Sequence, residues 1–161
     1  EILAGELVKE PSPVVVHQRV SRELFILLAM HFRQADPRGE VFASPLDVTL
    51  GDDNVVQPDI LYVSGEQRGI IQETRIDGAP LLAIEIISES SRRIDRLQKR
   101  QIYQGAGIQH YWLADPLEKT LECLALRDGA YILAAAGMDE EIVVHPDLPG
   151  LSIPLGELWR E

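Results

Sequence analysis

The seven residues Leu81–Ile87 are the feature that most constrains how this chain folds. All of them except Glu85 are apolar, which is typical of a β-strand buried on both faces. A carboxylate inside such a strand is costly in free energy unless it is paired, coordinated to an ion or protonated. We therefore expect a compensating group beside Glu85.

Two neighbouring segments carry ionisable groups that can lie beside Glu85. The apolar run Val55–Val63 is interrupted by Pro58 and then Asp59, and a proline places a strand at a sheet edge or bulge, where side chains are redirected. Beyond the polar segment Ser88–Ser91, apolar residues recur at helical spacing, and this predicted helix carries Lys99. Two acids on adjacent strands and a lysine nearby form a set that holds a divalent ion and an attacking water.

At these residues the chain resembles the PD-(D/E)XK nuclease superfamily, and more closely a large bacterial family of restriction-endonuclease-like domains. No single motif is specific, and the resemblance rests on order, spacing and context over most of the chain. The segments that carry it are Gly5–Leu7, Ser44–Val48, Gln57–Asp59, Glu85–Ser88, Asp95–Tyr103 and Tyr111–Pro116.

The resemblance implies roles for individual residues. Asp59 and Glu85 would bind Mg²⁺ or Mn²⁺, with Glu6 as a third carboxylate, and Lys99 would assist the attacking water. The superfamily pattern places a lysine two residues after the second acid, where this chain has Ile87. In the closer family the following helix supplies the lysine, which corresponds to Lys99.

Each of these residues also has an ordinary structural interpretation. Glu85 can be a buried partner of a structural cation, and Asp59 can accept hydrogen bonds from backbone N–H groups at a strand end. Glu6 can be a surface residue beside a turn. Lys99 lies four residues after Asp95, the spacing of an ordinary helical ion pair.

The implied activity is metal-dependent hydrolysis of phosphodiester bonds in nucleic acid, most naturally DNA, by an endodeoxyribonuclease-like enzyme. Because cutting a duplex needs two copies of the site, the resemblance also implies a homodimer, formed through the C-terminal strands or another edge strand. The alternative is a catalytically silent dimer with a nuclease fold that acts as a binding or regulatory module, since a shared fold does not guarantee a shared function.

The net charge of −11 argues against binding to nucleic acid, because that affinity comes largely from basic side chains that neutralise phosphates. The basic residues are nevertheless clustered. Arg92, Arg93, Arg96 and Arg100 lie close together with Lys99, and three of the arginines share one helical stripe. We expect these four arginines to contact nucleic acid, although the same stripe can be a solvated helix face.

Composition gives no sign of a second domain, an anchor or a zinc centre. With 161 residues and 45% hydrophobic content, the chain fits one domain over 1–161. A single cysteine excludes an internal disulfide, and no apolar run is long enough to span a membrane, so a cytoplasmic protein is expected. No two histidines have the close spacing of a metal-binding motif.

The pattern predicts an α/β fold with a restriction-endonuclease-like core, in which a mixed central β-sheet is flanked by helices and extended by N-terminal and C-terminal β-hairpins. The expected elements are an N-terminal hairpin within Glu1–Lys9, a helix over Val14–Phe32, strands over Glu40–Ala43, Leu46–Leu50, Val55–Val63, Leu81–Ile87 and Gln109–Ala114, a second helix up to Gly105, a hairpin of Thr120–Leu126 with Ala130–Ala134, a strand over Glu141–His145 and a closing helix within Pro154–Trp159.

Overall fold

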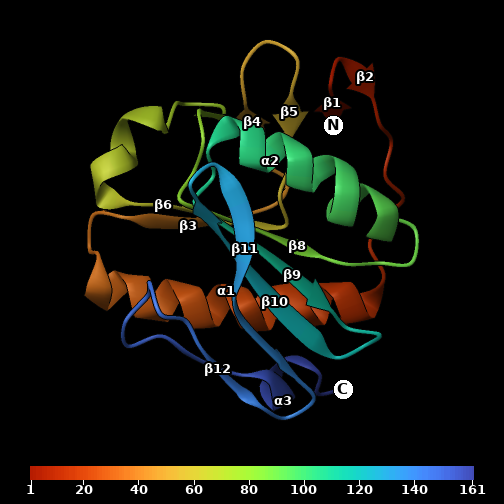
Figure 1. Cartoon of the computed structure of the whole chain (residues 1–161), viewed down its shortest axis with the longest axis vertical. Coiled ribbons are helices and arrows are strands. Elements are labelled where there is room, and N and C mark those ends of the chain that lie inside the picture. Colours follow the sequence, from red (N-terminus) through yellow and green to blue (C-terminus); the bar gives the residue numbers. More distant parts are fainter.

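A mixed six-stranded sheet forms the centre of the computed structural model, which describes all residues from 1 to 161 (Figure 1). Its strands, in spatial order, are β11 (Ala130–Met138), β10 (Thr120–Arg127), β9 (His110–Asp115), β8 (Leu82–Ile86), β6 (Ile60–Val63) and β3 (Glu40–Ala43). Strands β8 and β9 are parallel, and every other neighbouring pair is antiparallel. The predicted mixed α/β architecture is confirmed.

Helices cover both faces of this sheet. The long helix α1 (Val15–Ala35) and the short helix α2 (Arg100–Ala106) lie on opposite sides of it in Figure 1. Helix α1 buries a stripe of residues at four-residue spacing, namely Val20, Leu24, Leu28 and Phe32. The remaining helical segments are η1 (Gly65–Ile70), η2 (Ile94–Lys99) and α3 (Leu155–Leu158). None of these helices combines the length and the apolar character needed to cross a membrane.

Two smaller sheets complete the fold. One has the order β2 (Glu6–Leu7), β1 (Ile2–Leu3), β5 (Val55–Val56), β4 (Val48–Thr49) and β7 (Ile76–Asp77), and the other pairs β12 (Ile142–Val144) with β13 (Ser152–Pro154). The predicted N-terminal hairpin is confirmed, with Ala4 and Gly5 both at positive φ in its turn. The predicted hairpin β10–β11 is also confirmed, with a register shift between Cys123 and Leu124, and β11 extends beyond the predicted end at Ala134.

Strand β8 is buried along its whole length, as its apolar run predicted. Successive side chains of a strand point to opposite faces. Ile84 and Ile86 belong to the core under α1, whereas Ala83 belongs to the core under α2. Glu85 shares the parity of Ala83 and therefore points toward the α2 face.

Pro58 marks the point where the chain leaves one sheet for another. The sequence predicted one strand over Val55–Val63, disturbed at the proline. Instead, β5 lies in the small sheet and β6 in the central sheet, with Pro58 and Asp59 between them. This crossing places Asp59 directly before β6, beside the end of β8.

The packing of α1 can be tested by shortening one buried side chain. We expect Leu24→Ala to lower the free energy of unfolding by about 2–5 kcal/mol, because Leu24 is fully buried and alanine would leave a cavity. Ile26→Ala on the same helix is the control, since Ile26 is 46% exposed. Urea unfolding followed by circular dichroism measures both, and equal losses would contradict the described core.

Candidate active site

Asp59, Glu85 and Lys99 meet at one end of strands β6 and β8. Pairing of Ile60 with Ile84 brings the start of β6 beside the second half of β8. Asp59 Oδ2 then accepts a hydrogen bond from the backbone N–H of Ile86 at 2.7 Å. Lys99 reaches the same place from the last residue of η2 and lies 3.1 Å from Glu85 Oε1.

The segment that carries Lys99 differs from the helix that was predicted there. Residues Ile94–Lys99 form a π-helix that continues into α2. Single turns of π-helix are rare and occur frequently at functional sites. Within this segment both Asp95 and Lys99 are buried, so a charged pair faces the sheet where an ordinary amphipathic helix has apolar residues.

A polar pocket of about 470 Å³ opens beside these residues. Only three of its seventeen lining residues are hydrophobic. Its charged lining residues come from the segment before α1, from α1 itself, from the β6–β8 edge and from η2, and they are Lys9, Glu10, His17, Asp59, Glu85 and Asp95. The pocket is therefore suited to a charged ligand.

Lys99 is the central cation of this site. Its Nζ lies within ion-pair distance of four carboxylates, and its side chain is only 1% exposed. The distances are 3.1 Å to Glu1, 3.1 Å to Glu85, 3.5 Å to Glu10 and 3.7 Å to Asp95. The helical pair with Asp95 is present, but it is the longest of the four contacts.

Burial and charge act in opposite directions on these groups. Desolvation raises the pKa of Glu85 well above its ordinary value, and the ammonium of Lys99 only partly offsets it. Burial by itself would lower the pKa of Lys99. Glu85 and the other carboxylates around it have the larger effect, so the pKa of Lys99 lies above its ordinary value. Lys99 consequently keeps its proton at neutral pH.

One lysine does not balance the carboxylates gathered around it. Lys99 has four carboxylate partners, and a fifth carboxylate, that of Asp59, lies close enough to raise the pKa of Glu85. The nearby imidazole of His17 pairs with Asp59, with 3.1 Å between Nε2 and Oδ2. The carboxyl groups that outnumber the one lysine give the site ligands for a cation.

Free carboxylate oxygens give such a cation its ligands. The hydrogen bonds to Glu85, from Lys99 at 3.1 Å and from the hydroxyl of Tyr103 at 2.7 Å, both end on Oε1. Those to Asp59, from Ile86 and His17, both involve Oδ2. Oε2 of Glu85 and Oδ1 of Asp59 have no hydrogen-bond partner in the protein, and carboxylate oxygens are the ligands that Mg²⁺ prefers.

Comparison with known proteins identifies the family of this chain. The model of the Uma2 family, described as "Putative restriction endonuclease", matches residues 1–156. The chain belongs to the Uma2 family. This membership supports a nuclease function, as the resemblance predicted.

A solved structure shows the same fold. The crystal structure of "a putative nuclease belonging to DUF820" from Anabaena variabilis ATCC 29413 superposes with a TM-score of 0.79 at 20% sequence identity, covering 98% of this chain and 88% of that one. The restriction-endonuclease-like core predicted for this Uma2 chain is thereby confirmed. No curated protein matches the sequence.

The third predicted ligand lies away from the site. Glu6 is exposed on β2 and does not line the pocket. Glu1, at the other end of the same hairpin, is the residue whose side chain is buried against Lys99. Both are acids beside the same short hairpin, and nothing in their sequence context indicates which of them turns inward.

The four predicted nucleic-acid-binding arginines are divided in the Uma2 structure. Arg92 donates to Asp115 at 2.5 Å and Arg96 donates to Glu122 at 2.5 Å, so both bind carboxylates of the protein. Arg93 and Arg100 are exposed. None of the four lines the pocket, which places the predicted stripe beside strands β9 and β10 and not at the pocket mouth.

His17 is the pocket residue that the sequence did not reveal. It has no histidine at metal-binding spacing in the sequence, and its partner Asp59 lies 42 residues away. Only the packing of α1 against the end of β8 brings the two side chains together.

Removing the central cation tests how the site is balanced. We expect Lys99→Met to lower the free energy of unfolding by about 3–5 kcal/mol, because it leaves buried carboxylates without their cation. Arg100→Met is the matched control, since Arg100 is the next residue and is exposed. Chemical denaturation at neutral pH compares the two, and an equal effect would contradict the central role of Lys99.

The raised pKa of Glu85 predicts a pH dependence. A carboxyl whose pKa is higher in the folded state than its ordinary 4.5 destabilises the fold as pH rises above that value. The stability of Glu85→Gln relative to the natural chain should therefore increase as pH is raised from 4.5. Unfolding curves across this range test it, with Glu73→Gln on an exposed residue as control. A difference that shrinks as pH rises would contradict the prediction.

Proposed function

We propose that this chain hydrolyses phosphodiester bonds in DNA with Mg²⁺ or Mn²⁺ held by Asp59 and Glu85. The observation that carries the proposal is the pair of carboxylates in one pocket, each with one oxygen lacking a protein partner, backed by the buried ammonium of Lys99. The Uma2 family match supports a nuclease.

Each group in the pocket has a chemical task in this proposal. A bound ion would supply an acidified water and polarise the phosphate. Lys99, which stays charged, would stabilise negative charge on the phosphoryl group and would not act as a base. Asp95 lines the pocket, and burial raises its pKa, so its carboxylate is suited to accept the proton of the attacking water.

His17 would orient Asp59. Its Nε2 holds Oδ2 together with the backbone N–H of Ile86, which leaves Oδ1 without a partner in the protein. A residue that fixes a metal ligand in this way affects metal affinity without touching the ion.

Cleavage of both strands of a duplex would need two copies of the chain. Strand β11 is at the edge of the central sheet and exposes Ile132 and Leu133. We propose this edge as the contact between two copies, because an exposed apolar edge strand is a ready template for pairing with another chain.

A silent binding module remains the alternative, and one observation favours it. Lys99 and Tyr103 already occupy Glu85 Oε1, so an internal cation compensates the buried carboxylate without any added ion. Two of the four arginines expected to contact DNA also bind carboxylates of the protein. A cleavage assay separates the two functions.

The decisive experiment is cleavage of labelled duplex and single-stranded DNA with Mg²⁺ or Mn²⁺, with EDTA as a control. We expect metal-dependent product from the natural chain and a loss on the order of a hundredfold or more in Glu85→Ala, because a metal ligand is removed. Glu73→Ala, on an exposed residue, should cleave normally. No product with any substrate or metal would favour the silent module, and full activity of Glu85→Ala would remove Glu85 from the mechanism.

The role of His17 has its own test. We expect His17→Ala to weaken Mn²⁺ binding by about 10–100-fold, and His17→Gln to restore part of it, because an amide N–H can still donate to Asp59. Titration calorimetry measures the affinity, and His31→Ala on the same helix is the control. Unchanged affinity in His17→Ala would show that Asp59 needs no support from this ring.

A further inference from the structure

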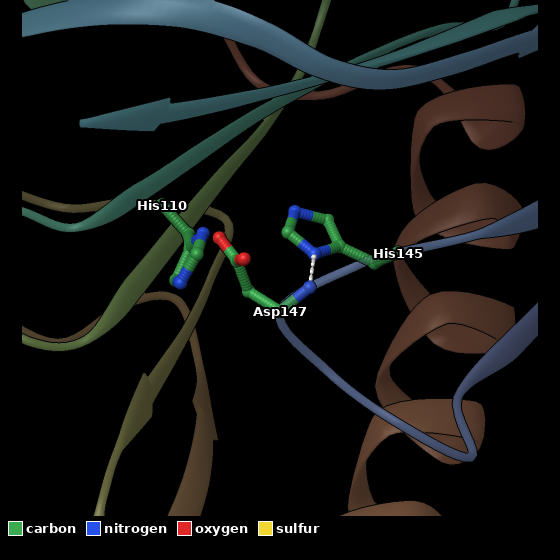
Figure 2. Close-up of side chains that lie close together, drawn as sticks. All are labelled: His110, His145 and Asp147. Carbon is green, nitrogen blue, oxygen red and sulfur yellow. Dashed lines mark hydrogen bonds between the residues drawn. The ribbon is translucent and has the colours of Figure 1, made fainter. Parts of the chain in front are cut away.

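A second cluster of metal-binding side chains lies apart from the pocket. His110, His145 and Asp147 each offer a ligand atom, and these atoms lie within 4.8 Å of one another (Figure 2). His110 begins β9, and the other two residues lie in the loop between β12 and β13. His110 has the parity of Trp112, which packs in the core under α1, so the cluster is on the opposite face of the sheet from Glu85.

Both imidazoles are buried with an unsatisfied ring nitrogen. His110 is 6% exposed and His145 is 1% exposed. Nδ1 of His110 and Nε2 of His145 are buried and have no hydrogen-bond partner. Buried polar atoms in native proteins nearly always have a bonding partner. Two unsatisfied nitrogens on neighbouring rings therefore indicate that a ligand or ion binds between them.

A proton is a poor candidate for that partner. Burial lowers the pKa of His110 to about 4, and burial also lowers the pKa of His145. Both rings are therefore neutral at neutral pH, which is the form that binds metal ions. Asp147 adds a negative charge, because its hydrogen bond from Arg127 lowers the pKa of its carboxyl.

We propose that His110, His145 and Asp147 bind a transition-metal ion of the Zn²⁺ class. Two imidazoles and one carboxylate are a characteristic ligand set for Zn²⁺, with the fourth position left to water. Mg²⁺ prefers ligand sets made of oxygen atoms, so this centre would differ from the pocket in the ion it selects. It would connect β9 to the β12–β13 loop and stabilise the fold, and it does not depend on nuclease activity.

The ligands must move a short way to bind an ion. Ligand atoms about 2.0–2.1 Å from Zn²⁺ at tetrahedral angles lie roughly 3.4 Å from one another. The candidate ligand atoms of this cluster lie up to 4.8 Å from one another. Asp147 is the exposed member of the cluster and has room for this movement. Nδ1 of His145 now accepts the backbone N–H of Asp147 at 3.0 Å, and an ion bound at the unsatisfied Nε2 would place the ring proton on Nδ1 and so replace this bond.

Arg127 competes with the ion for Asp147. Its guanidinium pairs with Oδ2 of Asp147, and its side chain is 43% exposed. A positive charge at this place repels a bound cation. Removal of Arg127 should therefore strengthen metal binding, an effect that a purely structural pair of histidines would not produce.

The test is equilibrium dialysis of the full chain against Zn²⁺ alone, in an Asp59→Asn, Glu85→Gln background that disables the pocket. We expect one bound ion, binding weakened on the order of tenfold or more by Asp147→Asn, and tighter binding in Arg127→Gln. Asp128→Asn, on an exposed residue of the neighbouring turn, should change nothing.

Other results would overturn the proposal. These are no bound Zn²⁺ in the background protein, or the same affinity in Asp147→Asn. His110→Gln provides a second check on the same centre, with its folding verified by circular dichroism. A Zn²⁺ affinity that survives both substitutions would place the ion elsewhere in the protein.

Discussion

The ion cluster around Lys99 is the interaction on which the site and much of its surroundings depend. A fully buried strand carries Glu85, and the carboxylate is tolerated because an ammonium and a tyrosine hydroxyl reach it. Lys99 in turn keeps its charge because four carboxylates surround it. The N-terminal hairpin, η2 and the central sheet are therefore joined by charge as well as by apolar packing.

The two proposed ion sites lie on opposite faces of the central sheet. Toward α2, odd-numbered residues of β8 and β9 frame the carboxylates, the lysine and two buried tyrosines. Toward α1, even-numbered residues form the larger apolar core, and His110 ends that face beside the β12–β13 loop. Because successive side chains of a strand point to opposite faces, the proposed hydrolytic ion and the proposed Zn²⁺-class ion would lie on opposite sides of the sheet.

Much of the fold and part of the site could be predicted from local patterns. The apolar run around Glu85 predicted a doubly buried strand, and the four-residue spacing from Val20 to Phe32 predicted α1. The resemblance to restriction-endonuclease-like domains, and no local period, indicated the family and the meeting of Asp59, Glu85 and Lys99. The strand and the helix could be predicted because the spacing of apolar residues along a segment shows which of its side chains are buried.

The tertiary structure alone decided the partners of these groups. Whether Glu1 or Glu6 turned inward depended on how a short hairpin docks, and the pairing of His17 with Asp59 and of His110 with His145 depended on packing across the sheet. The π-helix at η2 and the carboxylate partners of Arg92 and Arg96 are set in the same way. The sequence by itself determined which segments are strands, helices and core, because those preferences are local. Distances between charged groups far apart in the chain are fixed only when the layers pack, and those distances control charge, pKa and metal binding.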